Sequence, residues 1–123
     1  MNLGITDRKA IVCASSRGLG KACALALARE GCLVVINGRN ADSLESTAAE
    51  IAAITGRAPL VVVADVSTCD GRKALLAACP APDILVTNNG GPEPGKAGQW
   101  DHDTWIAAVE GNMLSGILLI QAV

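Results

Sequence analysis

Short apolar runs alternate with longer amphipathic segments along this chain. Four runs are almost wholly apolar, at Ala10–Cys13, Leu33–Ile36, Leu60–Val63 and Ile84–Thr87. Runs of this length without polar alternation are typical of strands buried on both faces of a parallel sheet. The segments that follow them predict helices at 21–29, 44–52, 72–79 and 104–123. The pattern therefore predicts an α/β fold in which a strand and a helix alternate four times.

Right-handed crossovers between parallel strands fix how these elements are arranged. The strands then lie in the spatial order 3-2-1-4, as part of a Rossmann-type doubly wound sheet with a ligand crevice between the carboxyl ends of strands 1 and 4. Asp42 with Glu45 is the predicted capping box of the second helix, and Gly56–Pro59 ends that helix. With 50% hydrophobic and 18% charged residues, the 123 residues are sufficient for one packed domain.

The segment between the first strand and the first helix has the composition of a phosphate-binding turn. A helix N-terminus carries unpaired N–H groups and partial positive charge, so a diphosphate binds there if no side chain blocks its approach. The small residues that keep this approach open are Ala14, Ser15, Ser16, Gly18 and Gly20. On spacing alone, a purely structural turn is the alternative.

The end of the second strand indicates which nucleotide this turn would bind. An NAD-binding fold places a carboxylate about 20 residues after the turn, where it accepts hydrogen bonds from the adenosine ribose. Here Asn37–Asn40 contains no acid, and the next acid is Asp42. Arg39 in this segment and Arg17 in the turn suit a 2′-phosphate instead, which predicts NADP(H). The alternative is that both arginines are solvated loop cations.

Four motifs together resemble those of the short-chain dehydrogenase/reductase family, from Lys9 to the end of the chain. CASSRGLG resembles the family's T-G-x-x-x-G-x-G turn, and Ala64-Asp65-Val66 resembles the segment with its adenine-contacting aspartate. Asn88-Asn89-Gly90-Gly91 resembles its N-N-A-G motif, and Asn112 falls where the family has the asparagine of its catalytic tetrad. The resemblance implies cofactor contacts by Ala14, Ser15, Ser16, Arg17, Gly18, Leu19, Gly20, Arg39, Asp65, Val66, Asn88, Asn89, Gly90 and Gly91. It implies a catalytic role for Asn112.

The chain departs from the family pattern in three respects. Cys13 and Ala14 replace the usual Thr and Gly, which puts a β-carbon at the tightest point of the turn, and Gly90 replaces the Ala of N-N-A-G. The family's Ser and Tyr-x-x-x-Lys follow a fifth strand, whereas these 123 residues contain no tyrosine. We therefore expect 1–123 to be a single, incomplete dinucleotide-binding domain without turnover of its own.

The activity implied by the resemblance is NADP(H)-dependent interconversion of a carbonyl and an alcohol, nearest to that of a 3-oxoacyl-carrier-protein reductase. A non-catalytic NADP(H)-binding or interaction module is the alternative. The expected partners are a small-molecule carbonyl or alcohol substrate and further copies of the chain. Self-association is expected because the edge of the fourth strand and the apolar face of Met113–Val123 would otherwise be uncovered.

Composition excludes several other classes of partner. The net charge is −2 and the ten Lys and Arg residues are scattered, so nucleic-acid binding is not expected. Met1–Lys9 lacks the apolar core of a signal peptide, and Met113–Val123 is too short and too interrupted to span a membrane. Five cysteines without a C-x-x-C pair or a histidine cluster predict buried, reduced thiols, no metal site and a cytoplasmic protein.

Several candidate residues also have simpler structural interpretations. Asp65 is either an adenine contact or a cap at the end of a strand. Asn88 either contributes to the cofactor site or only satisfies the backbone of the neighbouring strand, and Asn112 is either catalytic or a polar residue that stabilises a helix kink. Trp100 and Trp105 are expected to be packing anchors, not ligand contacts.

Overall fold

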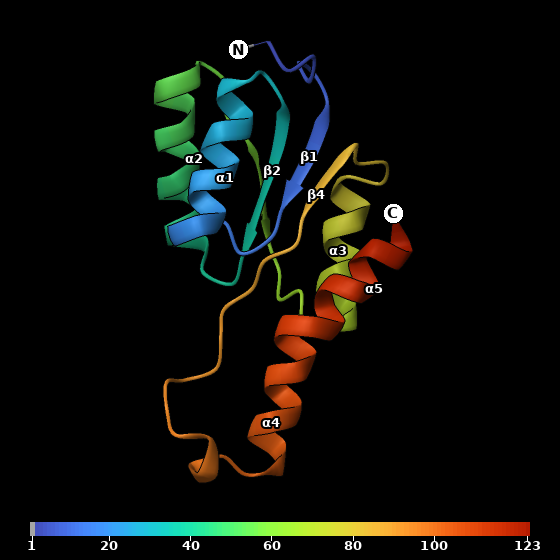
Figure 1. Ribbon diagram of the computed structural model, residues 1–123. Helices are drawn as coiled ribbons and strands as arrows, with labels where there is room; N and C mark the ends of the chain where they lie inside the picture. The colour runs from blue at the N-terminus through green and yellow to red at the C-terminus, as the bar shows by residue number, and fades with distance from the viewer. Residues whose placement is uncertain (1) are drawn as a thin grey trace.

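The computed structural model describes residues 2–123. Its elements, in chain order, are β1 (Lys9–Val12), α1 (Gly18–Arg29), β2 (Leu33–Gly38), α2 (Ala41–Thr55), β3 (Leu60–Val63), α3 (Cys69–Ala78), β4 (Ile84–Val86), the 3₁₀ turn η1 (Ala97–Gln99), α4 (His102–Val109), the π-helical turn η2 (Glu110–Leu114) and α5 (Ser115–Ala122). Figure 1 shows the sheet between two layers of helices. Strands and helices alternate as the apolar pattern predicts.

The four strands form one parallel sheet in the order β3-β2-β1-β4. Lys9 of β1 lies opposite Leu33 of β2, so these two central strands begin at the same level. β3 begins later, because its first residue, Leu60, lies opposite Val35. The predicted order 3-2-1-4 of a Rossmann-type doubly wound sheet is therefore confirmed, and β4 forms one edge of the described sheet.

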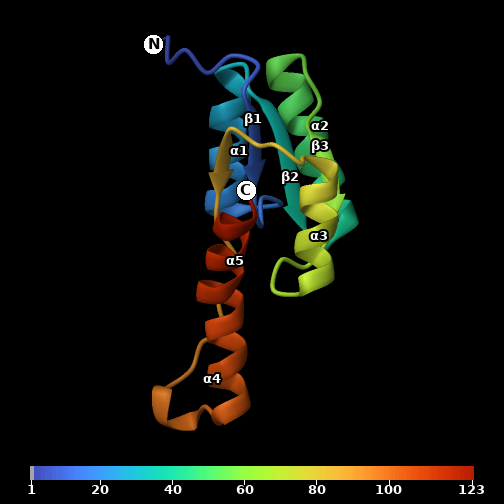
Figure 2. The same cartoon turned by 90° about the vertical axis from the view of Figure 1, so that its right-hand side faces the viewer.

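Each face of the sheet has its own apolar core. α1 and α2 cover one face, and α3 and α5 cover the other (Figures 1 and 2). Successive side chains of a strand point to opposite faces, so Val12 packs in the core beneath α1 and α2 whereas Ile11 packs beneath α3 and α5. Both side chains are fully buried. Burial on both faces explains why the strands lack polar alternation.

The predicted starts of the first three helices are wrong, and side-chain capping explains those of α2 and α3, since α3 begins at Cys69, after the N-cap Thr68, and not at Arg72. α1 begins at Gly18 instead of Lys21, so the last part of the predicted turn Ala14–Gly20 is already helical. α2 is capped by Asn40, whose side chain accepts a hydrogen bond from the Ser43 N–H at 2.8 Å, and not by a box of Asp42 and Glu45. Asparagine is as good an N-cap as aspartate, and the helix begins at the first residue that supplies one.

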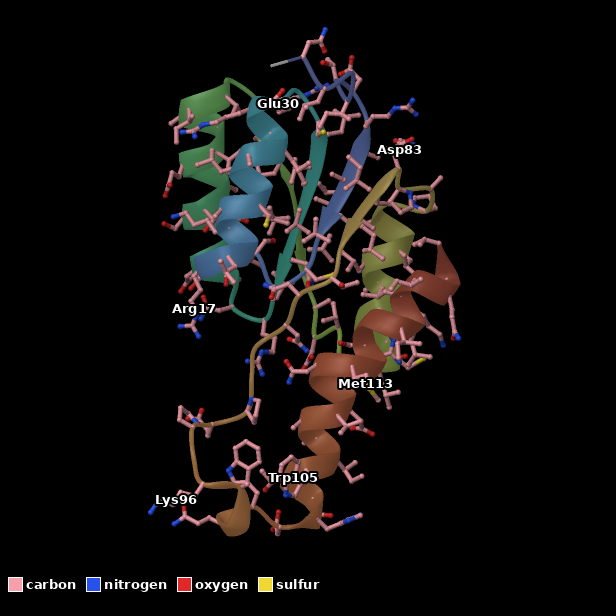
Figure 3. All side chains as sticks on the ribbon, in the orientation of Figure 1. Arg17, Glu30, Asp83, Lys96, Trp105 and Met113 are labelled. Carbon is pink, nitrogen blue, oxygen red and sulfur yellow. The ribbon has the colours of Figure 1, made fainter. Side chains whose placement is uncertain are left out.

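The C-terminal part of the chain forms an arm that extends away from the sheet. The segment after β4, with η1 and α4, projects beyond the carboxyl ends of the strands in both views (Figures 1 and 2). Trp100 and Trp105 pack together at the end of this arm that is farthest from the sheet (Figure 3), with ring centroids 5.0 Å apart in an edge-to-face arrangement. The expectation that both tryptophans are packing anchors therefore agrees with the fold, although Trp105 remains 45% exposed.

The helical rod made by α4, η2 and α5 exposes a large apolar surface. Its exposed apolar residues are Trp105, Ile106, Val109, Met113, Leu114, Ile117, Leu118, Ile120 and Val123. The helical segment His102–Ala122 is continuous over 21 residues and is long and apolar enough, by length and composition, to cross a membrane. The expectation that no segment here is long enough considered only Met113–Val123, which is about half as long as this helical segment. Length and composition do not distinguish a membrane span from a helix whose apolar face is covered by other protein.

The cysteines only partly follow the expectation of burial. Cys13, Cys32 and Cys79 are buried, but Cys23 and Cys69 are exposed, and all five are free thiols. Cys23 immediately precedes the buried Ala24 on α1, and one residue along a helix turns a side chain by about 100°, here out of the core. Within residues 2–123, no group of three or more His, Cys, Asp or Glu side chains is placed to hold a metal ion.

Candidate functional site

The turn between β1 and α1 presents uncapped backbone N–H groups. Arg17, the N-cap of α1, is extended and makes no side-chain capping bond, and no acid lies in the first helical turn. The amino end of α1 therefore offers its N–H groups and its partial positive charge to an external anion. Figure 3 places Arg17 at the carboxyl end of the strands, opposite Glu30 and Asp83.

The shape of the turn depends on one strained residue and one glycine. Ala14 has φ of +47°, a left-handed conformation that residues with a β-carbon seldom adopt. Its carbonyl accepts a hydrogen bond from Asn88 Nδ2 at 3.2 Å. A β-carbon on Gly20 would overlap this same carbonyl, so the helix can approach the turn closely only with glycine at that position. The family's usual glycine at position 14 is thus replaced at a cost in backbone strain.

Ser15 and Asn37 tie the turn to the second strand. The Ser15 N–H donates to the Asn37 carbonyl at 2.7 Å, and the Asn37 N–H donates to Ser15 Oγ at 2.9 Å. The Asn37 side chain extends the link to β3, because its Nδ2 donates to the carbonyls of Val62 and Ala64 at 3.1 and 3.0 Å. This buried network joins the carboxyl ends of β1, β2 and β3 to the turn, and so positions the turn over the sheet.

A cavity of about 260 Å³ opens at this end of the sheet. Its lining includes ten of the predicted cofactor residues: Ala14, Ser16, Arg17, Leu19, Arg39, Asp65, Val66, Asn88, Asn89 and Gly90. Four predicted residues do not line it: Ser15, Gly18, Gly20 and Gly91. Ser15 and Gly20 are instead buried behind the turn and act on its shape. The three lining residues absent from the prediction are Asn37, Gly38 and Ala64.

Two free cations line this cavity. Arg17 and Arg39 are both exposed, and neither guanidinium forms a hydrogen bond or an ion pair with any group in residues 2–123. Arg39 reaches across the cavity, since its Nη2 lies 3.9 Å from the point that a β-carbon on Gly90 would occupy. Asp65 is the sole acid among the described lining residues. The cavity is therefore suited to an anionic ligand.

Asp65 has the capping role that the sequence left open, while it also lines the cavity. Its Oδ1 accepts hydrogen bonds from the Ser67 hydroxyl at 2.6 Å and the Ser67 N–H at 2.9 Å. The Ser67 hydroxyl hydrogen bond is the main reason that the pKa of Asp65 is lowered, and the Arg39 charge lowers it further. The carboxylate is thus ionised and fixed, with Oδ2 free of any hydrogen bond within residues 2–123.

Asn112 lies beside this cavity and not in it. A separate cavity of about 50 Å³ is lined by Asn112, Thr87 and Ser115, and it shares Val66, Asn88 and Asn89 with the larger one. Asn112 is part of the π-helical turn η2, and its Nδ2 donates to the Ala108 carbonyl at 3.1 Å. Asn89 Nδ2 donates to the Gly111 carbonyl at 2.7 Å and so joins the end of β4 to η2. π-turns of this kind are frequent at functional sites.

Thr47 also supports the site, and sequence reasoning missed it. Its side chain is 2% exposed, and its hydroxyl donates to the Ser16 carbonyl at 2.8 Å, which fixes the turn from the side of α2. The signal for Thr47 and Asn37 is the same: a polar residue at a position that the apolar period assigns to the core. Cys13 is buried, and this burial raises its thiol pKa to about 11, which disfavours the reactive thiolate.

Comparison with known proteins identifies relatives of this chain. The sequence model described as "short chain dehydrogenase" matches residues 8–123. The uncharacterized oxidoreductase YvaG of Bacillus subtilis is 38% identical over 120 residues, which are 97% of this chain and 46% of that protein. The NADPH-dependent reductase BacG of Bacillus subtilis is 36% identical over 95 residues, 73% of this chain and 37% of that protein.

A solved structure extends the likeness to three dimensions. The crystal structure of L-sorbose reductase from Gluconobacter frateurii, complexed with NADPH and L-sorbose, superposes with a TM-score of 0.91 at 28% identity, over 100% of this chain and 48% of that one. The chain thus spans about half the length of such relatives. A family match from residue 8 to residue 123, together with the sheet order and the turn geometry, shows that the chain belongs to the short chain dehydrogenase family.

Proposed function

We propose that this chain is the cofactor-binding half of an NADP(H)-dependent oxidoreductase that interconverts a carbonyl and an alcohol. The observation that carries the proposal is that the guanidinium groups of Arg17 and Arg39 line the cavity without partners, while the carboxyl end of β2 supplies no carboxylate to it. A 2′-phosphate offers each arginine a charge-assisted hydrogen bond, whereas a ribose hydroxyl offers no charge.

The described residues fit a dinucleotide in shape as well as in charge. The uncapped amino end of α1 suits the diphosphate, and glycine at position 20 leaves the close approach that the turn requires. Asp65 and Val66 are proposed to contact the adenine, and Asn88, Asn89, Gly90 and Gly91 to carry the nicotinamide side. When bound, the cofactor would supply or accept a hydride, and this chain's own contribution is to hold and orient it.

Asn112 is proposed as the one catalytic residue of this half. Its position in η2, next to a cavity large enough for water, fits a role in holding a water that links to a lysine elsewhere in the complete protein. The general acid would be a tyrosine, which the 123 residues do not contain. The substrate is proposed to be a small carbonyl compound, and a 3-oxoacyl thioester remains the named candidate.

The proposal is tested by titrating the chain with NADPH and NADH. An arginine–phosphate contact contributes about 1.5–3 kcal/mol, less where it is exposed, so two contacts favour NADPH roughly tenfold to a thousandfold. Arg39→Asp should remove most of that preference or reverse it. Arg29→Asp makes the same charge change at an exposed position at the other end of α1 and should leave the ratio unchanged. Equal affinity of the unchanged chain for both nucleotides would disprove the assignment of Arg17 and Arg39.

The exposed apolar surface of the rod from α4 to α5 is the observation that fits a second candidate, a non-catalytic NADP(H)-binding or interaction module. Both candidates predict NADPH binding, but only the enzyme predicts turnover from a longer chain that carries a Ser and a Tyr-x-x-x-Lys. We also propose that the complete protein is cytoplasmic and homo-oligomeric, and that it binds neither nucleic acid nor a membrane. The exposed apolar rod from α4 to α5 supports self-association.

A further inference from the structure

A second cavity, of about 290 Å³, lies at the end of the sheet opposite the nucleotide site. It is lined by Lys9, Ala28, Cys32, Leu33, Val34, Val35, Ile51, Arg57, Ala58, Pro59, Leu60, Ala78, Cys79 and Pro80. These residues come from the amino ends of β1, β2 and β3, the last turns of α1 and α3, the body of α2 and the α2–β3 connection. Asp83, labelled in Figure 3 at the start of β4, marks this end of the molecule.

The register of the sheet creates this cavity. β3 begins opposite Val35, so the first two residues of β2, Leu33 and Val34, have no partner on that side. The connection that would continue β3 instead turns away at Ala58 and Pro59, and it forms the outer wall. The space beside β2 is therefore left open between the two layers of helices. All the described lining residues fall between Lys9 and Pro80 in the sequence.

The lining of the cavity is mainly apolar, and two cations lie at its margin. Its apolar wall includes Val34, Val35 and Ile51, which are at most 5% exposed. Its two charged residues are Lys9 and Arg57, and no acid is found among the described residues that line it. Arg57 already forms an exposed ion pair with Asp7 at 3.0 Å, whereas the Lys9 ammonium has no partner within residues 2–123. Lys9 lies close enough to Asp83 for its charge to lower the pKa of that carboxyl, but Asp83 is ion-paired with Arg8 at 2.9 Å, so the Lys9 ammonium is the less engaged of the two cations.

We propose that this cavity binds an amphipathic carboxylate, with a short acyl chain among Val34, Val35 and Ile51 and the carboxylate at Lys9. The mainly apolar lining and the volume of about 290 Å³ suit a short acyl chain, since small-molecule sites are concave, mostly apolar and of about this size or larger. The few charged groups at the margin would fix the orientation of the ligand, as polar groups do in most small-molecule sites. The site is separate from the nucleotide cavity, and the proposal stands or falls independently of NADPH binding.

Binding is tested by calorimetric titration with octanoate, 1-octanol and octylammonium, which share one chain and differ in the head group. Ala28→Leu places a larger side chain into the cavity from α1, and Ala26→Leu, at an exposed position of the same helix, is its control. Lys9→Gln removes the free cation, and Lys73→Gln removes an exposed one on α3 that does not line the cavity. Circular dichroism and thermal unfolding first establish that each variant is folded.

The expected result is saturable binding in the order octanoate, octanol, octylammonium. Ala28→Leu should abolish it, and Lys9→Gln should weaken octanoate binding roughly two- to fivefold while leaving octanol binding unchanged, as expected for a partly exposed ion pair. Both controls should bind like the unchanged chain. Equal affinity for octanoate and octanol would overturn the carboxylate assignment. Absence of saturable binding, or binding that persists in a folded Ala28→Leu variant, would overturn the site itself. If Ala28→Leu does not fold, the comparison of octanoate with octanol and the effect of Lys9→Gln still test the proposal.

Discussion

Asn37→Ala is the substitution that most directly tests how the fold positions the nucleotide turn. The Asn37 side chain is 1% exposed and donates hydrogen bonds to the carbonyls of Val62 and Ala64. Alanine would leave both carbonyls without a donor, and an unsatisfied buried polar group costs about 1–3 kcal/mol. Because both hydrogen bonds are only partly buried, we expect the free energy of unfolding to fall by about 2–4 kcal/mol. This is a large share of the 5–15 kcal/mol typical of a domain.

The same substitution should also weaken nucleotide binding, because the network fixes the strained turn. Asn37 Oδ1 faces the Ala14 N–H at 3.5 Å, and the Asn37 backbone holds Ser15. Loss of one such constraint, worth about 1 kcal/mol, corresponds to about a fivefold loss of NADPH affinity. Leu75→Ala is the matched control, because it removes a fully buried side chain beneath α3 at a cost of about 2–5 kcal/mol without removing any hydrogen bond to the turn.

Urea unfolding gives the stability of each variant, and titration of the folded fraction gives its NADPH affinity. The reasoning requires that both variants lose stability and that Asn37→Ala alone loses affinity. If Leu75→Ala weakens NADPH binding as much as Asn37→Ala does, the effect belongs to general loosening of the domain. If Asn37→Ala has the same free energy of unfolding as the unchanged chain, the carbonyls of Val62 and Ala64 do not need the Asn37 side chain, and the network does not stabilise the fold.

Three further predictions follow from the site and the surface. The 123-residue chain should show no measurable NADPH oxidation with ketones or 3-oxoacyl thioesters, because losing a positioned acid costs about 10²- to 10⁴-fold, and turnover by a chain of verified mass would refute the proposed mechanism. The exposed apolar rod should cause self-association, and sedimentation that shows a monomer at all concentrations would contradict this. The free energy of unfolding should fall below about pH 4. Folding lowers the pKa of Asp65, so the ionised carboxylate stabilises the folded chain at any pH above the unfolded-state pKa, and this stabilisation is lost as the pH falls through the folded-state pKa. Ser67→Ala should reduce the loss of stability at low pH. An unchanged dependence of stability on pH in this variant would show that the Ser67 hydrogen bond is not the cause.

Most of the fold could be predicted from the sequence because its main signal is local. Four apolar runs separated by helical segments allow few arrangements once crossovers are right-handed, so the order 3-2-1-4 follows. The small residues of the turn between β1 and α1 likewise indicated a phosphate-binding turn, although on spacing alone they fit a purely structural turn as well. The helix starts were less predictable, because Asn40 and Asp42 are comparable caps and only the backbone conformation selects Asn40.

The sequence by itself determined which residues have the right chemistry for the site: two arginines, one aspartate, paired asparagines and a small-residue turn. Only the tertiary structure decided which of them face the cavity, because this depends on contacts between segments far apart in the chain. Asn37 and Thr47 contact the turn across 22 to 31 residues of sequence, and Asp65 is held by Ser67 while it faces Arg39. Long-range packing alone also creates the second cavity, since it arises from the offset between β2 and β3, and no local pattern encodes that offset.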